Sequence, residues 1–233
     1  MGTHRKGGLP DLAEMQEHDR MRITLLGEPG SGKTTLGRRV EAEGLAVYLS
    51  GSRLLQTYID ARGAGWQELQ AAKDGGNRAD PAFTHRLLRE ALEGLPAGTS
   101  VVLDGFPKGL AELTRTENAL GAPIDLAILL DCPTAIRSAR IEHRVACPGC
   151  GAVATIAAAS SAAHGPGCAA TFMPRVDDHP QVVARREAQE SIELLATRFE
   201  TDGRLWRVRA ERSAEAVFQD VSATLRQMTQ RAG

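Results

Sequence analysis

The sequence predicts an α/β fold in which a five-stranded parallel sheet is flanked by helices. Short apolar runs recur along the chain and are separated by stretches of helix-forming residues. The first of these runs ends in a glycine-rich turn, which a helical stretch follows directly. Near-continuous apolar strands that alternate with helices indicate a parallel sheet covered on both faces. Ligands of such a sheet are expected at the carboxyl ends of its strands.

The expected elements follow one another in a regular order. The predicted strands are residues 22–26, 45–49, 100–103, 124–130 and, as the weakest, 204–209. The first helix is expected over 32–43, and a closing amphipathic helix is expected over 213–231. In the closing helix, apolar side chains recur near helical spacing at Ala214, Val217, Phe218, Val221 and Leu225.

Two segments interrupt this alternation. Residues 50–96, between the second and third strands, are polar and mostly helical in pattern. Residues 146–174 are rich in Ala, Gly, Ser and Cys and have almost no large apolar side chains. Such a segment buries little surface by itself, so it needs a bound metal or a partner surface to be ordered.

Charge and hydropathy exclude several classes of function. The formal net charge of the 233-residue chain is −1, so no global positive field recruits nucleic acid or an anionic membrane. No apolar run approaches the roughly 18–20 residues that a membrane span needs. Residues 1–20 lack the apolar stretch of a secretory signal and are expected to form a flexible polar extension. These features predict a cytoplasmic protein that binds neither nucleic acid polymers nor membranes.

The segment Gly27–Thr35 reads GEPGSGKTT and contains the full G-x-x-x-x-G-K-[ST] pattern. Glycines let successive backbone N–H groups turn inward around an anion, and the following helix adds the positive end of its dipole. Lys33 is expected to reach the β- and γ-phosphates of a nucleoside triphosphate, and the Thr34 hydroxyl to bind Mg²⁺. The residues expected to hold the triphosphate are Gly27, Pro29, Gly30, Ser31, Gly32, Lys33, Thr34 and Thr35. The same loop serves ATPases, GTPases and kinases, so the pattern alone predicts only nucleotide binding.

Further motifs distinguish among ATPases, GTPases and kinases. Leu103–Lys108 (LDGFPK) resembles the DGFPR motif of adenylate kinases and related nucleoside monophosphate kinases. Arg140-x-x-x-Arg144 resembles the entry to the lid of that family, and Arg175-Val-Asp-Asp resembles its lid exit. Arg186 falls where the family has another phosphate-binding arginine. These motifs occur in the family's order and approximate spacing, so the resemblance covers residues 21–227.

The resemblance implies a P-loop nucleoside kinase fold with three parts. The core is expected at residues 21–49, 97–144 and 180–233. An acceptor-binding insert is expected at 50–96, and a lid at 145–179. ATP is then the donor of a phosphoryl group, a small phosphorylated molecule is the acceptor, and the protein is expected to be a monomer.

The resemblance also implies roles for individual residues. Arginines stay charged and donate forked hydrogen bonds to phosphate oxygens, which suits them to phosphoryl transfer. Arg140, Arg144, Arg175 and Arg186 are therefore expected to line the cleft and to stabilise the transferring group, together with Lys33. Asp104 is expected to hold Mg²⁺ through water. The residues expected to bind the acceptor are Ser50, Gly51, Arg53, Gly105, Lys108, Glu112, Arg175 and Arg186.

The acceptor site departs from the family pattern. The family usually has T-G-D-x-L-R where this chain has Ser50–Leu55, so Leu55 replaces the arginine that grips the monophosphate. Arg53 either compensates for that loss or, on another face of the helix, does not. Lys108 replaces the DGFPR arginine, which keeps the charge and loses the bidentate fork.

Glu112 stands where adenylate kinases have a glutamine that reads adenine. An ionised glutamate only accepts hydrogen bonds, so it opposes adenine N1 and suits the donors of guanine or cytosine. Alternatively, the alignment with the family slips at this position, or Glu112 points to solvent. Two other hypotheses remain: a kinase for an unusual nucleotide or phosphonate intermediate, and a non-catalytic ATP-binding regulatory protein with a decayed acceptor site.

Three cysteines fall within the expected lid. Cys147-Pro-Gly-Cys150, followed by Cys168, resembles the zinc-bearing lid of many bacterial adenylate kinases, and C-x-x-C suits tetrahedral Zn²⁺. The family's fourth ligand position is Thr171, a poor zinc ligand, whereas His164 could complete a Cys₃His site. The alternatives are free thiols in a metal-free lid and a disulfide. Cys132, beside the fourth strand, is expected to be a small core residue.

Overall fold

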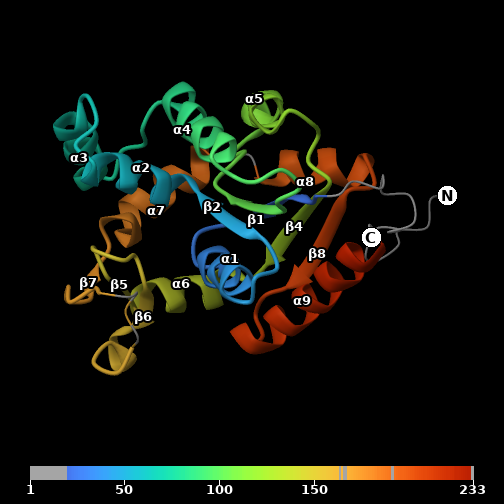
Figure 1. Ribbon diagram of the computed structural model, residues 1–233. Helices are drawn as coiled ribbons and strands as arrows, with labels where there is room; N and C mark the ends of the chain where they lie inside the picture. The colour runs from blue at the N-terminus through green and yellow to red at the C-terminus, as the bar shows by residue number, and fades with distance from the viewer. Residues whose placement is uncertain (1–19, 163, 165–166, 190–191, 232–233) are drawn as a thin grey trace.

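A five-stranded parallel sheet forms the centre of the molecule (Figure 1). The computed structural model describes residues 20–162, 164, 167–189 and 192–231. The strands lie in the order β2-β3-β1-β4-β8. Their bounds are β1 Arg22–Leu26, β2 Val47–Ser50, β3 Val101–Asp104, β4 Leu126–Asp131 and β8 Leu205–Arg209. The predicted class is confirmed. Each predicted strand is present: β1 has the predicted bounds, and the ends of the other strands lie within two residues of those predicted.

Helices cover both faces of the sheet. One face packs against α1 and α9, and the other against α4, α5 and α8 (Figure 1). The helices are α1 Lys33–Ala42, α2 Gly51–Asp60, α3 Trp66–Asp74, α4 Pro81–Glu93, α5 Leu110–Leu120, α6 Thr134–Glu142, α7 Pro180–Gln189, α8 Ile192–Thr201 and α9 Ala214–Arg231. No helix in the described part of the chain is long and apolar enough to cross a bilayer.

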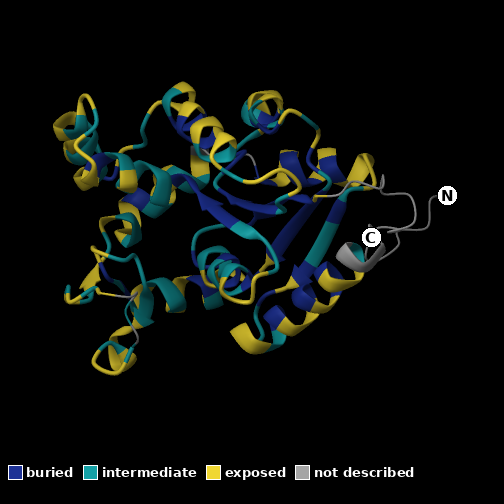
Figure 2. Ribbon diagram, in the orientation of Figure 1, coloured by how far each residue is buried: buried dark blue, intermediate teal, exposed yellow. Residues whose placement is uncertain are grey.

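Strand β4 shows why the apolar runs are continuous. Successive side chains of a strand point to opposite faces of the sheet. Ile128 and Leu130 pack into the cluster with α1 and α9, whereas Ala127 and Leu129 pack into the cluster with α4, α5 and α8. Every residue of Leu126–Leu130 is therefore buried, as Figure 2 shows for the central strands.

The segment between β2 and β3 is helical, as predicted. Helix α4 begins with Pro81 behind the cap residue Asp80, whose side chain accepts from the Ala82 N–H at 2.8 Å. Leu88 of α4 is fully buried against the sheet. Helix α3 buries no residue, so the insert is anchored to the sheet by α4 and extends outward through α3.

A small antiparallel sheet lies within the segment predicted as the lid. Its strands, in the order β6-β5-β7, are β5 Arg144–Ala146, β6 Val153–Thr155 and β7 Met173–Pro174. Two short 3-10 turns follow β6 and β7, at Ile156–Ala158 and Val176–Asp178. Of the residues between 146 and 174 that the structure describes, Cys147 alone is buried. The expectation that this segment has almost no core of its own is met (Figure 2).

Candidate nucleotide-binding cleft

A cleft of about 970 Å³ opens at the carboxyl ends of β1, β2 and β3. Its volume is at the upper end of the range for ligand pockets. The predicted site residues that line it are Gly27, Pro29, Gly30, Ser31, Gly32, Lys33, Thr34, Thr35, Ser50, Gly51, Asp104, Gly105, Lys108, Arg140, Arg144, Arg175 and Arg186. The structure therefore brings the phosphate loop, the lid arginines and part of the expected acceptor site to one opening.

The phosphate loop joins β1 to α1. Gly27, Gly30 and Gly32 have φ of 139°, 84° and 108°, which side-chain-bearing residues rarely adopt. A Cβ atom on Gly27 would lie 2.9 Å from the carbonyl oxygen of Leu130, so the loop rests directly on the neighbouring strand. Lys33 Nζ donates to the loop's own carbonyls, those of Gly27 and Glu28. The Lys33 ammonium group is therefore held against the backbone of the phosphate loop.

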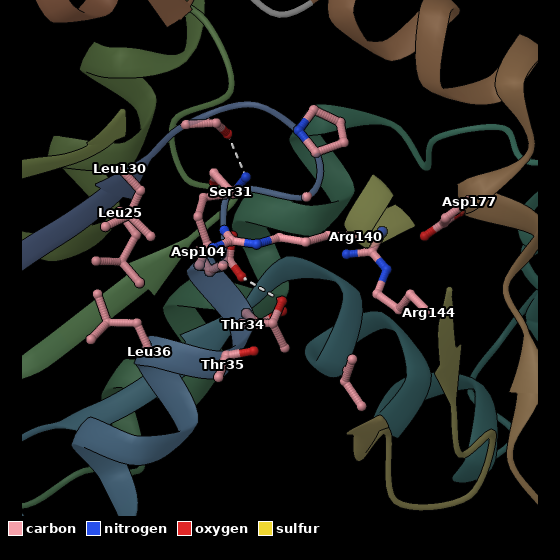
Figure 3. A pocket seen from close by; sticks show the side chains of 18 of the residues that line it. Leu25, Ser31, Thr34, Thr35, Leu36, Asp104, Leu130, Arg140, Arg144 and Asp177 are labelled. Atoms are coloured by element: carbon pink, nitrogen blue, oxygen red, sulfur yellow. Dashed lines mark hydrogen bonds between the residues drawn. The ribbon is translucent and has the colours of Figure 1, made fainter. Parts of the chain in front are cut away.

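Thr34 and Asp104 meet at the base of the cleft. The Thr34 hydroxyl donates to Asp104 Oδ2 at 3.2 Å, as the dashed line in Figure 3 shows. The same oxygen accepts from the Tyr48 hydroxyl at 2.6 Å. Burial, reinforced by the Asp104 carboxylate, raises the pKa of Tyr48 above its ordinary value, so Tyr48 stays a donor. A hydroxyl and an oriented carboxylate are oxygen ligands of the kind Mg²⁺ prefers, and the pair fits the predicted magnesium site.

Two arginines reach the cleft from α6 and the start of β5. Arg140 donates to the Cys132 thiol at 3.5 Å and to the Arg212 carbonyl at 3.2 Å. Arg144 donates from two nitrogens to the Asp178 carboxylate, with a distance of 2.8 Å from Nε. Figure 3 shows both guanidinium groups facing the same opening.

Asp177 holds the other two arginines together. Its carboxylate accepts from Arg175 at 2.9 Å and from Arg186 at 2.5 Å. Burial raises the pKa of Asp177, but the two guanidinium groups outweigh that effect and hold the pKa below its ordinary value. Arg186 Nε is buried and has no hydrogen-bond partner among the described residues, which leaves a donor for an anion. Sequence reasoning quoted the two lid-exit aspartates as a motif and missed this orienting role.

Arg53 differs from its predicted place. Its guanidinium donates to both Glu41 oxygens, at 2.7 and 2.8 Å, and to the Tyr48 carbonyl. It does not line the cleft, whereas Leu55 does. Glu41 on α1 and the Tyr48 carbonyl hold the Arg53 guanidinium outside the cleft lining, so the structure does not support the expected acceptor-binding role.

Glu112 also differs from its predicted place. It lies in the first turn of α5, where a carboxylate is favoured by the helix dipole. Its Oε2 accepts from the backbone N–H of Lys108 at 3.3 Å, and Glu112 does not line the cleft. Its neighbour Lys108 does line the cleft. Three polar residues that belong to no sequence motif also line the cleft: Lys73 near the end of α3, and Asn77 and Arg78 between α3 and α4.

Replacing Arg53 by methionine is expected to lower the free energy of unfolding by about 1 kcal/mol, because the ion pair with Glu41 is more than a third exposed and weakened by solvent. The KM for the acceptor is expected to stay within about twofold, because no uniform binding contact is removed. Denaturant unfolding and steady-state kinetics check the two parts. A large rise in acceptor KM at unchanged stability would contradict this placement.

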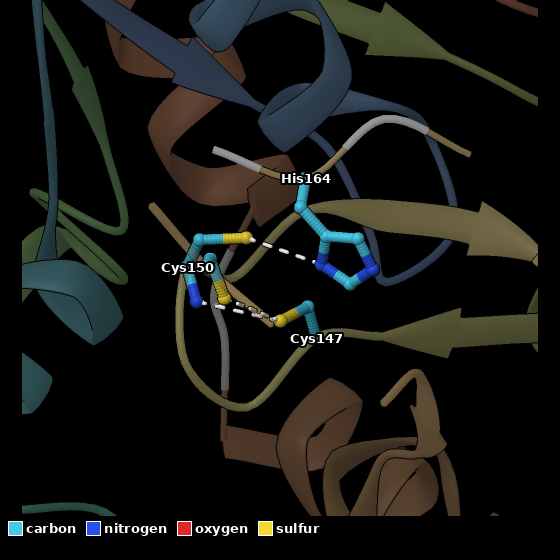
Figure 4. A group of neighbouring side chains, drawn as sticks. Cys147, Cys150 and His164 are labelled. Atoms are coloured by element: carbon cyan, nitrogen blue, oxygen red, sulfur yellow. Dashed lines mark hydrogen bonds between the residues drawn. The ribbon is translucent and has the colours of Figure 1, made fainter. Parts of the chain in front are cut away.

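Three thiols and one imidazole gather in the lid (Figure 4). The ligand atoms of Cys147, Cys150, His164 and Cys168 all lie within 4.8 Å of one another. Cys147 Sγ is 3.4 Å from Cys168 Sγ, and Cys150 Sγ is 3.9 Å from His164 Nδ1. Tetrahedral zinc with bonds of about 2.3 Å to sulfur needs similar ligand separations. The donor set therefore fits a Cys₃His zinc site, and the described cysteines form no disulfide.

The cluster is also attached to the core. Arg38 of α1 donates to the carbonyl oxygen of Cys150 at 3.0 Å. Cys132, outside the cluster, is buried in the core as predicted.

Comparisons with known proteins agree with this architecture. A family model described as an AAA domain matches residues 23–150, just over half of the chain. The adenylate kinase of Syntrophomonas wolfei is 24% identical over 212 residues, which cover 88% of this chain and 99% of the relative. The adenylate kinase of Nitrosococcus oceani is 27% identical, with 88% and 98% covered. That of Thermococcus gammatolerans is 31% identical over 175 residues, with 71% and 75% covered.

The family model, over residues 23–150, includes the phosphate loop, Arg140 and Arg144. The sheet is that of a P-loop fold, and arginines from α6, the lid and α7 surround one opening. Together with the matches above, these features show that the chain belongs to the adenylate kinase family of P-loop phosphotransferases.

Proposed function

We propose that the protein transfers the γ-phosphoryl group of ATP to a small phosphorylated acceptor, most simply a nucleoside monophosphate, and releases ADP and a nucleoside diphosphate. The observation that carries the proposal is the convergence of a phosphate loop and four arginines on one cleft. Transfer between two anions requires charge neutralisation and alignment more than covalent chemistry. An acceptor phosphate is already ionised, so the reaction needs no general base.

On the donor side, the backbone N–H groups of the loop and Lys33 bind the phosphates of ATP. Lys33 exchanges the loop carbonyls for phosphate oxygens, which accept from an ammonium more strongly than neutral carbonyls do. Thr34 and Asp104 would hold Mg²⁺, which neutralises charge on the phosphates when it is bound. Tyr48 keeps the Asp104 carboxylate turned toward that position.

Arginines supply the charge on the opposite side of the transferring group. In this proposal Arg140 and Arg144 contact the phosphates of ATP, and Arg175 and Arg186 contact the acceptor phosphate and the transferring group. Asp177 and Asp178 accept from Arg144, Arg175 and Arg186 and so hold their guanidinium planes in place before a substrate arrives. Preorganised donors of this kind stabilise charge in the transition state without reorganising during the reaction.

In the lid, Cys147, Cys150, Cys168 and His164 would hold Zn²⁺ in a structural role. Four protein ligands close the coordination sphere, which is typical of structural and not catalytic zinc. The metal would supply the ordering that the lid's few buried side chains do not.

The acceptor side favours a molecule other than AMP. Leu55 lies in the cleft where an arginine is usual in the family, and Arg53 is held by Glu41. The acceptor is therefore an unusual nucleotide or a phosphonate if the plain monophosphates fail. The ordered lid arginines argue against a non-catalytic regulatory protein.

The experiment is an acceptor panel with Mg-ATP, followed by direct separation of the nucleotide products. The panel contains AMP, GMP, CMP, UMP, their deoxy forms and simple phosphonates. Turnover is expected with at least one acceptor and not with the Lys33→Met variant purified in the same way, which excludes a contaminating kinase. ATP binding without turnover of any acceptor would defeat the proposal in favour of the regulatory alternative.

A further inference from the structure

We infer that Arg137 of α6 is a positioning residue that couples the phosphate loop to α7, the helix that carries Arg186. The inference rests on the proposed function and deepens it. Arg137 lies three residues before Arg140 and belongs to none of the motifs above. Its side chain is only 10% exposed, so its contacts are largely shielded from water.

The guanidinium of Arg137 contacts three segments: the phosphate loop, α7 and the turn that joins β4 to α6. Its NH1 nitrogen donates to the Pro29 carbonyl of the phosphate loop at 3.2 Å and to Glu187 Oε1 of α7 at 2.7 Å. Its Nε donates to the Cys132 carbonyl after β4, and NH2 donates to the Thr134 hydroxyl, both at 3.2 Å. Every nitrogen of the group is used, which fixes the orientation of the plane.

The backbone of α6 supports the same part of the loop. A Cβ atom on Gly30 would lie 2.8 Å from the Arg137 carbonyl oxygen and 3.1 Å from the Ile141 side chain. The turn at Pro29 and Gly30 therefore sits directly on α6. Any shift of α6 or of the Arg137 side chain changes the position of the loop that holds the donor phosphates.

Glu187 connects α7 to Arg137. It follows Arg186 directly, and Arg186 lines the cleft and contacts Asp177. Through one guanidinium, the loop that holds the donor and the helix that supplies an arginine to the transferring group are kept at a constant separation. Since alignment carries much of the catalysis, a displacement of about 1 Å costs on the order of 10²-fold in rate.

The competing explanation is that Arg137 and Glu187 form an ordinary stabilising ion pair. Partly buried ion pairs are often replaced by apolar side chains without loss of stability. The two explanations therefore differ in a double variant. Arg137→Met combined with Glu187→Leu restores packing between α6 and α7 but not the hydrogen bond to Pro29.

The test compares Arg137→Met, Arg137→Lys, Glu187→Leu and the double variant with the wild-type protein, using the acceptor found in the panel. Melting temperature, ATP affinity, KM and kcat are measured for each. We expect Arg137→Met to lower kcat by about 30- to 100-fold, with a smaller change in ATP affinity, because the loop N–H groups and Lys33 remain. Lysine is expected to recover only part of the rate, because it lacks the fork.

The double variant is decisive. It is expected to recover the melting temperature lost in Arg137→Met while kcat stays low. Recovery of kcat together with stability would overturn the inference and leave a structural ion pair. Arg22→Met is the matched control: Arg22 is buried, pairs with Asp125 at 3.2 Å and lies at the opposite end of the sheet. It should lower stability at unchanged kcat.

Failure of this inference is separable from failure of the proposed function. If the wild-type protein turns over no acceptor, the proposed function fails before the variants are compared. If the wild-type protein is active and Arg137→Met retains its kcat, the inference alone fails.

Discussion

Replacing Arg186 by alanine is expected to lower kcat by at least about 10³-fold, the lower end of what one arginine contributes to phosphoryl transfer. Arg186 lines the cleft, and its Nε is buried with no partner among the residues that the structure describes. A transferring phosphoryl group would accept from that nitrogen. Because Asp177 already orients the guanidinium, its charge acts on the transition state without a cost of ordering.

The kinetics of Arg186 variants separate this role from a loss of folding. ATP affinity and melting temperature should change little, whereas kcat falls, and lysine should restore only part of the rate because it lacks the forked donors. Arg198→Ala removes the same charge from an exposed side chain of α8 that pairs with Asp202 and is the control. An Arg186→Ala protein with more than a tenth of the wild-type kcat would remove Arg186 from the catalytic set.

Removing the zinc ion that we propose for the lid is expected to unfold the lid locally and to lower kcat by about 10²-fold, because Arg144 and Arg175 lose their positions. Cys147 is the buried side chain of a segment with almost no other core. Structural zinc contributes on the order of 10 kcal/mol to the folding of small zinc domains, which is far more than the buried surface here supplies.

Metal analysis of the purified protein, with and without a chelator, checks this prediction. One zinc ion per chain is expected, and Cys150→Ser is expected to lose it, whereas Cys132→Ser, outside the cluster, retains it. His164→Ala tests the fourth ligand, and full zinc occupancy in that variant would exclude His164. A zinc-free wild-type protein with full activity would contradict the structural role of the metal.

The strands and the phosphate loop were predictable from the sequence, because each depends on a short-range pattern of residues. A strand buried on two faces needs an unbroken apolar run, and Leu126–Leu130 has one. The loop needs glycines at positions of positive φ, and Gly27, Gly30 and Gly32 occupy them. Each pattern is complete within a few residues, so no tertiary contact was needed to recognise it.

The acceptor side was less predictable because its residues are oriented by partners far away in sequence. Arg53 was a candidate ligand until Glu41, on a different helix, was seen to hold it. Glu112 was a candidate reader of the base, and it instead accepts from the backbone of Lys108. Helical spacing tells which residues share a face of α2 or α5, but not what faces them.

By itself, the sequence predicted a parallel sheet and a phosphate loop at Gly27–Thr35, and it placed several arginines in the motifs of its family. Only the tertiary structure decided which cations serve the cleft. A guanidinium group pairs with a carboxylate that the fold places within reach. Arg186 pairs with Asp177 at the cleft, whereas Arg53 pairs with Glu41. The bridge from Pro29 through Arg137 to Glu187 likewise exists only once three separate segments have folded together.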